Sequence, residues 1–334
     1  MKKDILKTLD KDYLLRFFKN KKDFYFPGSK NIADLKIKRI SPLWAKQNCL
    51  AKYVITFADK KTKTVRGTAG SGPTKKGTVK IADYLYHHGF NQGNLIISRP
   101  LDFIAAANLF FYEEAPGQTL LEKLRTVELS EAENYFSEIA AWLTKLHALP
   151  SKKFKKARFI GVKGYAKIFS QIEKLTPELK KELIPLEEVE FIDKVWEKDN
   201  VLIHNDFYLR NIIVNNKRIY GIDFDLAGIG PRLMDLASFY GSFEFPPEIW
   251  NLNFANQEKK ELQEVFLKSY CQLNKINYGE TKKELKKFLL KIFLDQVHYY
   301  ASFSFKCWRF LSEQEKQLSV LKIKKILSQA KKYL

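Results

Sequence analysis

Apolar residues recur at two different spacings along the chain, and the change between them divides it into two regions. The first region is rich in short runs of β-branched and aromatic residues separated by polar or glycine-containing turns. Such runs predict strands, and a polar turn between two of them predicts a hairpin. One helix, which Gly89 ends, interrupts the series. The expected strands are residues 52–58, 64–69, 95–98 and 109–113, the turn of the hairpin is 59–63, and the helix is 79–88.

An amphipathic helix is expected before these strands. Ile5, Leu9, Tyr13 and Phe17 fall four residues apart, and Pro27 follows with a glycine. This spacing places the four side chains on one helical face. Residues 1–30 are therefore expected to form a helical extension, and residues 31–114 a small antiparallel β lobe.

After residue 115 the apolar spacing becomes mainly helical. Residues 132–149 place Ile139, Trp142 and Leu146 on one face, and residues 246–334 show a similar pattern. The sequence thus predicts an α+β protein with two lobes, in which residues 115–334 form a large, mainly helical lobe.

Composition and charge narrow the functional classes. The 334 residues include 45% hydrophobic and 29% charged residues, which is typical of a globular protein, and the net charge is +20. Short basic groups such as Lys75-Lys76 are spread along the chain, with no zinc finger, RNA-binding aromatic signature or clear helix-turn-helix, so a solvated basic surface is favoured over nucleic-acid binding. The three cysteines form no CxxC pair, and neither a signal peptide nor a membrane span is expected, which together favour a cytoplasmic protein.

The candidate chemistry begins after a short apolar strand, residues 201–203. His204 and Asp206 follow it directly, and Asn211 comes five residues after Asp206, before a second apolar strand. A carboxylate that holds an acceptor hydroxyl and an amide that binds a metal on a nucleotide are the groups that phosphoryl transfer requires. Asp206 is therefore predicted as the catalytic carboxylate and Asn211 as a metal ligand.

A further acid follows the next strand. Residues 219–222 are expected to form the second strand of a hairpin that ends at Asp223. Carboxylate and amide oxygens are hard ligands suited to Mg²⁺. Asp223 is predicted as the main magnesium ligand, and Asp225 as either a second metal contact or a residue that orders the loop.

Two neighbouring residues have supporting roles. His204 belongs to the catalytic set, but a structural histidine hydrogen-bonded to loop backbone is favoured over a proton shuttle. Asp235 is expected either to cap a helix or to brace the catalytic loop.

These motifs resemble the aminoglycoside phosphotransferase and choline-kinase-like branch of the protein-kinase-like fold. The resemblance rests on four segments, read here as His204-Asn205-Asp206 with Asn211, Ile222-Asp223-Phe224, Gly230-Pro231 and Asp235-Leu236-Ala237. The residues from Glu113 to Leu120 are similar to the hinge of that family. The resemblance implies ATP or GTP with Mg²⁺, a small-molecule hydroxyl acceptor, and an adenine pocket lined by Glu113, Glu114 and Ala115.

The small lobe departs from the family pattern. The family places a lysine on the third strand to hold phosphates and a glutamate on the next helix, whereas this chain has Arg66 and, in the helix, Asp83 as its only acid. Arg66 either holds a phosphate or is an exposed strand residue. Glycine is also sparse near residues 41–49, where a loop covering the phosphates is expected.

Three hypotheses follow. The first is an ATP-dependent phosphotransferase acting on a small-molecule hydroxyl, with the acceptor against the region after residue 239. The second is a catalytically weak or inactive kinase-like protein that binds a nucleotide or a partner, and the third is a basic nucleic-acid-binding protein. Candidate acceptor contacts, chosen by composition, are Tyr240, Phe243, Glu244, Trp250 and Tyr299.

Overall fold

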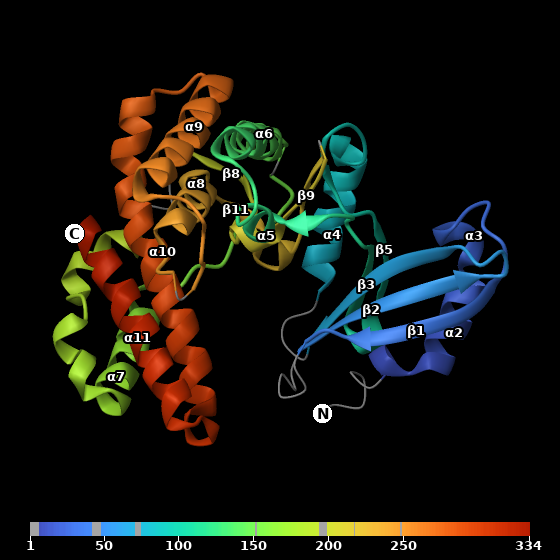
Figure 1. Ribbon diagram of the computed structural model, residues 1–334, viewed down its shortest axis with the longest axis horizontal. Helices are drawn as coiled ribbons and strands as arrows, with labels where there is room; N and C mark the ends of the chain where they lie inside the picture. The colour runs from blue at the N-terminus through green and yellow to red at the C-terminus, as the bar shows by residue number, and fades with distance from the viewer. Residues whose placement is uncertain are drawn as a thin grey trace. The chain divides into compact units, whose positions relative to one another are not determined.

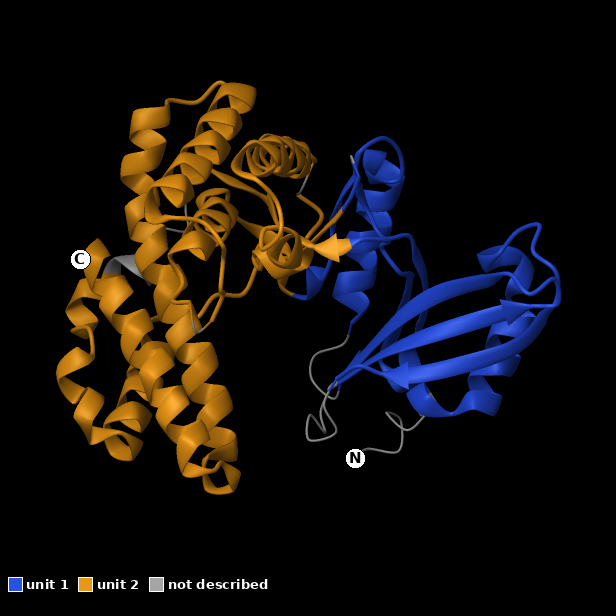
Figure 2. Ribbon diagram, viewed as in Figure 1, with its two compact units in different colours: residues 1–117, 215–225 blue, residues 118–214, 226–334 orange. Residues whose placement is uncertain are grey.

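The computed structural model describes residues 7–41, 48–70, 75–150, 152–193, 199–216, 218–247 and 249–334. The chain forms two compact units (Figures 1 and 2). Unit 1 contains residues 1–117 and 215–225, and unit 2 contains residues 118–214 and 226–334. The antiparallel β lobe and the larger helical region confirm the α+β class predicted from the sequence. Segment 215–225 returns to unit 1, although the sequence alone groups it with the large lobe.

Unit 1 is built on a five-stranded antiparallel sheet. The predicted hairpin is present, with Val65 opposite Tyr53 and the left-handed residue Lys60 (φ 66°) in its turn. In spatial order the strands are β1 (Ile32–Arg39), β2 (Asn48–Phe57), β3 (Thr62–Gly70), β6 (Leu109–Glu113) and β5 (Pro100–Ile104). Strands β1 and β5 were not expected from the sequence.

The N-terminal helix belongs to the core of unit 1. Helix α2 (Lys11–Asn20) supplies Leu14 and Phe18, and the short helix α3 (Lys22–Tyr25) supplies Tyr25; all three are buried with Tyr53 and Phe111 of the sheet. The ring centroids of Phe18 and Phe111 are 5.2 Å apart. Because the sheet face would otherwise be open to water, these residues form part of the folded unit. Ile5 lies outside the described residues.

The remainder of unit 1 links a helix to a parallel strand pair. Helix α4 (Lys76–Leu85) continues into a π-helical turn, η2 (Tyr86–Phe90), where Gly89 has φ 96°. Strand β4 (Leu95–Ile97) does not join the large sheet; it pairs in parallel with β10 (Arg218–Gly221), with Ile96 opposite Tyr220. Segment 215–225 is therefore held in unit 1 by backbone hydrogen bonds.

Unit 2 consists mainly of helices packed around aromatic side chains. Trp142 and Phe207 are stacked at 5.2 Å, and Phe239 lies 4.4 Å from Phe266, measured between ring centroids. Within the described residues of the chain, no helix is both long and apolar enough to span a bilayer. The helices are α5 (Leu120–Lys123), α6 (Leu129–His147), α7 (Val162–Leu175), α8 (Leu233–Gly241), α9 (Asn256–Asn274), α10 (Tyr278–Cys307) and α11 (Glu313–Ala330).

Two small strand pairs in unit 2 position the motif residues. Strand β7 (Gln118–Thr119) pairs with β9 (Ile212–Asn215), and β8 (Asn200–Ile203) pairs with β11 (Gly228–Pro231). The other edge of β11 is hydrogen-bonded to residues 155–157. A Cβ atom at Gly228 would lie 2.8 Å from the Ala157 nitrogen, so this close approach requires a glycine. The register fixes the end of β8, where the candidate catalytic loop begins.

Candidate active site

The start of the catalytic loop is held by a buried carboxylate. Asp235, at the first turn of α8, is fully buried. Its Oδ2 accepts a hydrogen bond from the backbone N–H of His204, and its Oδ1 accepts one from that of Asn205, both at 2.7 Å. Asn205 has φ 61°, and its side-chain amide donates to the carbonyl oxygens of Arg158 and Leu226 at 3.2 Å. These bonds define the turn through which the chain leaves β8.

Asp235 also belongs to a series of hydrogen bonds between buried side chains. Nε2 of His147 donates to Asp235 Oδ2 at 3.1 Å, and Nδ1 of His147 lies 2.6 Å from the hydroxyl of Tyr270. Burial raises the pKa of Tyr270, so the phenol keeps its proton and can donate to Nδ1. This assigns the Nε2–H tautomer to His147. The buried carboxylate thus has three hydrogen-bond donors, and α6, α8 and α9 together support the loop.

His204 is fully buried and surrounded by aromatic rings. Its ring centroid lies 6.4 Å from that of Trp142 and 5.5 Å from that of Phe207. The role of His204 stays a prediction.

Asp206 and Asn211 are brought together within the loop. The Asn211 Nδ2 group donates to both the backbone oxygen and the Oδ2 atom of Asp206, each at 2.8 Å. The backbone N–H of Asn211 donates to the Tyr208 oxygen at 2.8 Å, and a short 3₁₀ turn, η7 (Leu209–Asn211), lies between them. Because the amide nitrogen faces Asp206, the amide oxygen of Asn211 points away from it. That oxygen is the atom with which an asparagine binds a cation.

An aromatic group lies beside this loop in unit 2. The ring centroid of Tyr208 is 5.8 Å from that of Trp250 and 6.0 Å from that of Phe245. The guanidinium carbon of Arg210 lies 5.7 Å from the ring centroid of Trp250. Burial and the charge of Asp206 raise the pKa of Tyr208, which places this tyrosine within the field of the Asp206 carboxylate. Sequence analysis did not single out Tyr208, since it lies inside the motif at an unspecified position.

The other candidate acceptor residues differ in position. Phe243 is buried between Phe136 and Phe239, and Glu244 accepts hydrogen bonds from Tyr333 and Gln263. Tyr299 is 61% exposed. Burial raises the pKa of Tyr240 to about 12. Of the five candidates, Trp250 is the one with a described contact to a residue of the catalytic loop.

The predicted metal ligand Asp223 lies at the end of β10, in unit 1. Its backbone is left-handed, with φ 65°, a conformation in which Asp and Asn are better tolerated than most residues. Two residues later, Asp225 makes two contacts with the start of α4. Thr78 Oγ1 donates to its Oδ1 at 2.9 Å, and Lys75 Nζ forms an ion pair with its Oδ2.

A polar chain continues from Lys75 to the large sheet. The Lys75 backbone N–H donates to Asn108 Oδ1, and Asn108 Nδ2 donates to the Gly70 oxygen, both at 2.7 Å. The end of β3, the start of α4 and the loop after Asp223 are thus connected by hydrogen bonds within unit 1. Sequence analysis counted Lys75 among surface lysines, and no local pattern indicates its partner.

Arg66 is paired with a residue of the predicted hinge. Its guanidinium forms an ion pair with Glu114 Oε1, while Lys52 Nζ lies 2.9 Å from Glu114 Oε2. Burial raises the pKa of the Tyr112 hydroxyl; the charge of Asp223 raises it further, and the charge of Arg66 opposes this. Arg66 and Asp223 therefore both act on the same tyrosine of unit 1.

The hinge residues line a pocket of about 530 Å³ in unit 1. Glu113, Glu114 and Ala115 contribute to its wall, with Arg99 and Arg218, and Arg66 is not among its lining residues. The Glu113 backbone N–H donates to the Arg99 oxygen at 2.9 Å. Three of the four predicted nucleotide-binding residues thus border one cavity.

The donor set has the chemistry that Mg²⁺ requires. The carboxylates of Asp206 and Asp223 and the amide of Asn211 offer oxygen ligands, and Mg²⁺ in kinase sites commonly shares such ligands with nucleotide phosphates and waters. In the part of the chain that the structure describes, no three His, Cys, Asp or Glu side chains form a metal-binding group. Asp206 and Asn211 belong to unit 2, whereas Asp223 and Asp225 belong to unit 1.

Comparison with known proteins supplies a family. The sequence model described as "Phosphotransferase enzyme family" matches residues 72–275, which is more than half of the chain. A search of curated proteins found no match.

Solved structures of similar fold include three kinases. Choline kinase from Cryptosporidium parvum has a TM-score of 0.63 and 15% identity, over 96% of this chain and 95% of that one. Ethanolamine kinase from Plasmodium vivax has a TM-score of 0.59 and 16% identity, over 95% and 88%. Amicoumacin kinase in complex with AMP-PNP, Ca²⁺ and Ami has a TM-score of 0.58 and 15% identity, over 88% of each chain. At these identities the likeness concerns the fold.

Proposed function

Because the chain belongs to the phosphotransferase enzyme family, we propose that it transfers the γ-phosphate of ATP or GTP to a hydroxyl group of a small molecule, with Mg²⁺. The observation that carries this proposal is the pair formed by Asp206 and Asn211, in which the amide nitrogen bonds the carboxylate and the amide oxygen is directed elsewhere. This arrangement gives one carboxylate for the acceptor and one oxygen for a metal.

In this proposal each motif residue has one task. Asp206 orients the acceptor hydroxyl and accepts its proton late, so most of its effect comes from positioning. Asn211 and Asp223 hold the metal, which when bound neutralises charge on the nucleotide phosphates. Asp235 keeps the loop in place through the two backbone N–H groups that it accepts from. Trp250 and Tyr208 provide an aromatic surface for the acceptor.

A screen of hydroxylated small molecules tests the function. The protein is incubated with ATP or GTP, with and without Mg²⁺, and nucleoside diphosphate and phosphorylated product are measured together. We expect magnesium-dependent transfer to at least one alcohol, and the Asp206→Asn protein serves as the blank. Nucleotide binding without transfer or hydrolysis would instead favour the inactive, kinase-like alternative.

For Asp225 we propose a positioning role. Thr78 contacts its Oδ1 and Lys75 its Oδ2, so both of its oxygens are engaged by the start of α4. The family resemblance calls for an ion pair between the third strand and this helix, but the helix here has no glutamate, and Arg66 is paired with Glu114. The contact of α4 with the loop after Asp223 supplies a comparable link within unit 1.

Removing the contact between α4 and Asp225 should lower turnover without removing a metal ligand. We expect Lys75→Met and Thr78→Val each to reduce kcat severalfold, because the loop that carries Asp223 loses one of its two contacts with α4. The KM for Mg²⁺ should change little in either variant. Lys76→Met, at the next position along the chain, is the matched control and should keep wild-type kcat. A rise in the KM for Mg²⁺ in Asp225→Asn, with kcat restored by excess metal, would instead assign Asp225 as a metal ligand.

Arg66 is proposed to hold the nucleotide phosphates. Arg66→Ala should raise the KM for nucleotide, by about tenfold for the loss of one charge-assisted contact worth roughly 1.5 kcal/mol, and should leave kcat nearly unchanged. Lys52→Ala is the matched control, since Lys52 is also paired with Glu114. Equal effects of the two variants would show that the ion pair, rather than a phosphate contact, matters.

A further inference from the structure

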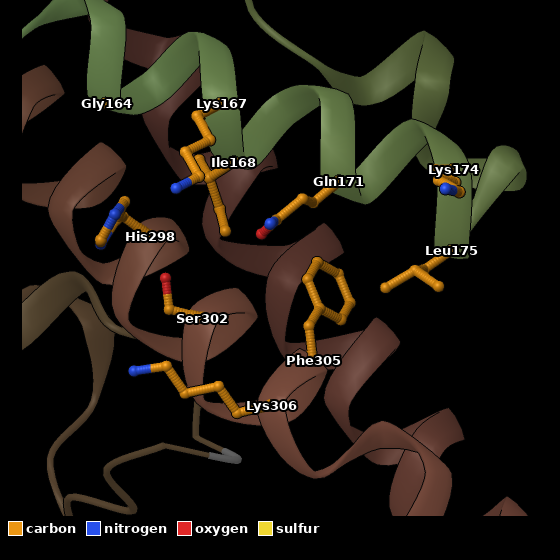
Figure 3. A pocket seen from close by; sticks show the side chains of 10 residues that line it. All are labelled: Gly164, Lys167, Ile168, Gln171, Lys174, Leu175, His298, Ser302, Phe305 and Lys306. Carbon is orange, nitrogen blue, oxygen red and sulfur yellow. The ribbon is translucent and has the colours of Figure 1, made fainter.

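A second pocket lies in unit 2, between α7 and α10. Its volume is about 570 Å³, which is within the range of small-molecule sites. Figure 3 shows that both helices supply side chains to it. None of its lining residues belongs to the catalytic loop, to segment 215–225 or to the hinge.

Positive charge is concentrated around this pocket. Lys167 and Lys174 come from α7 and Lys306 from α10, and no acidic residue lines the pocket. Within the described parts of the chain, none of these lysines has an acidic partner within ion-pair distance.

The nearest acid on α10 already has its own partners. Asp295, one turn before the pocket, accepts from Lys291 Nζ at 2.8 and 2.9 Å and from the Tyr165 hydroxyl at 2.5 Å. Lys291 is 1% exposed, so this group is part of the core between the helices. Asp295 is therefore paired with a buried cation, and within the described residues it forms no ion pair with the pocket lysines.

The rest of the lining is apolar or uncharged. Ile168, Leu175 and Phe305 provide an apolar wall, and Figure 3 shows Phe305 between the two helices. The side chains of Gln171 and Ser302 offer uncharged hydrogen-bond donors beside it. The pocket thus combines an apolar surface with cationic groups at its edge.

We propose that this pocket binds a small anion with an apolar body, such as an aryl or alkyl phosphate or carboxylate. The lysines would bind the charged head, and the wall formed by Ile168, Leu175 and Phe305 would cover the body. None of the lining residues has a task in the proposed phosphoryl transfer, and the proposal does not rest on that activity.

His298 reports on the pocket's charge. Burial lowers the pKa of its imidazole, and so do the charges of Lys291, Lys306 and Lys167, whereas Asp295 opposes them. A bound anion would raise this pKa, because it favours the charged imidazole. For an anion whose own charge stays constant, linkage predicts that affinity increases as the pH falls from the raised pKa of His298 in the complex to its lower pKa in the free protein.

The probe for the test is phenyl phosphate, which has both parts of the expected ligand. We expect saturable binding by calorimetry and an upward shift of the His298 pKa by NMR titration. Inorganic phosphate and benzyl alcohol, which carry only one part each, should bind at least tenfold more weakly. If inorganic phosphate bound as tightly as phenyl phosphate, the pocket would hold an adventitious ion only and the proposal would be overturned.

Charge-matched variants separate the pocket from the general basic surface. The double variant Lys167→Gln/Lys306→Gln should lose phenyl phosphate binding at least tenfold. Lys259→Gln/Lys260→Gln on α9 removes the same charge elsewhere and should bind within twofold of wild type. Equal losses in both double variants would show a diffuse electrostatic effect and contradict the proposal, as would the absence of saturable binding in the wild-type protein.

An acidic lipid headgroup is chemically similar to the proposed soluble anion, so a separate experiment must distinguish the two. Sedimentation with phosphatidylcholine vesicles containing phosphatidylglycerol should give equal binding for the two double variants. A different outcome would contradict the proposal of a soluble ligand. If Lys167→Gln/Lys306→Gln alone lost vesicle binding, and the wild-type protein showed no saturable binding of phenyl phosphate, the pocket would be assigned to a membrane surface.

Discussion

Asp223→Asn should abolish phosphoryl transfer while leaving the fold intact. Loss of a carboxylate that binds a cation removes charge stabilisation of the transition state, and we expect turnover to fall by roughly 10³-fold or more. Asparagine is the informative replacement, because the backbone at this position has φ 65° and Asn tolerates that region. Nucleoside diphosphate production under saturating nucleotide and Mg²⁺ measures the effect.

Two comparisons make the Asp223 result specific. Asp223→Ala should also be inactive but less stable, by roughly 1 kcal/mol, since alanine is strained in the left-handed region. Asp83→Ala removes an exposed acid of α4 and should retain wild-type turnover. An active Asp223→Asn protein with an unchanged magnesium requirement would remove Asp223 from the metal site.

Asp206→Asn should lower kcat by roughly 10²–10⁴-fold, the usual range for a positioned acid–base group. Its amide oxygen can still accept from Asn211 Nδ2, so the hydrogen bond now seen at 2.8 Å can persist. The KM for nucleotide should therefore change little, and the loss should appear in the step that uses the acceptor hydroxyl. Single-turnover measurements with radiolabelled nucleotide separate that step from binding.

The control for Asp206 is another acid of unit 2. Asp199 forms an ion pair with Arg232, and Asp199→Asn should keep kcat within twofold of wild type. If Asp206→Asn retained more than a third of wild-type turnover, Asp206 would not be the carboxylate that orients the acceptor.

The elements found from the sequence are those whose pattern is local. Val65 and Tyr53 lie opposite each other because alternating apolar residues flank a polar turn, and this pattern is complete within the hairpin. The pattern of strand β8 and of the loop after it is equally local, since Asn211 is hydrogen-bonded to Asp206, only five residues before it. The predicted family was confirmed by the match over residues 72–275.

The features that the sequence did not reveal depend on distant partners. Strand β1 alternates apolar residues with lysines, a local pattern that the sequence analysis did not use, whereas β5 begins with Pro100 and has no such pattern. The contact of Lys75 with Asp225 joins residues far apart in the chain, and a lysine pair gives no sign of such a partner. Spacing predicted a helix within residues 1–30, where the described residues form α2 and α3, but only the sheet face explains which side chains are buried.

The pairing of β4 with β10 has a consequence for biosynthesis. During translation Ile96 and Ile97 leave the ribosome well before Tyr220, so the strand edge that they form stays open while the intervening chain is made. A recombinant fragment that stops at residue 117 would keep that edge unsatisfied and would tend to aggregate. Expression of unit 1 alone therefore requires residues 215–225 to be joined back to it through a linker.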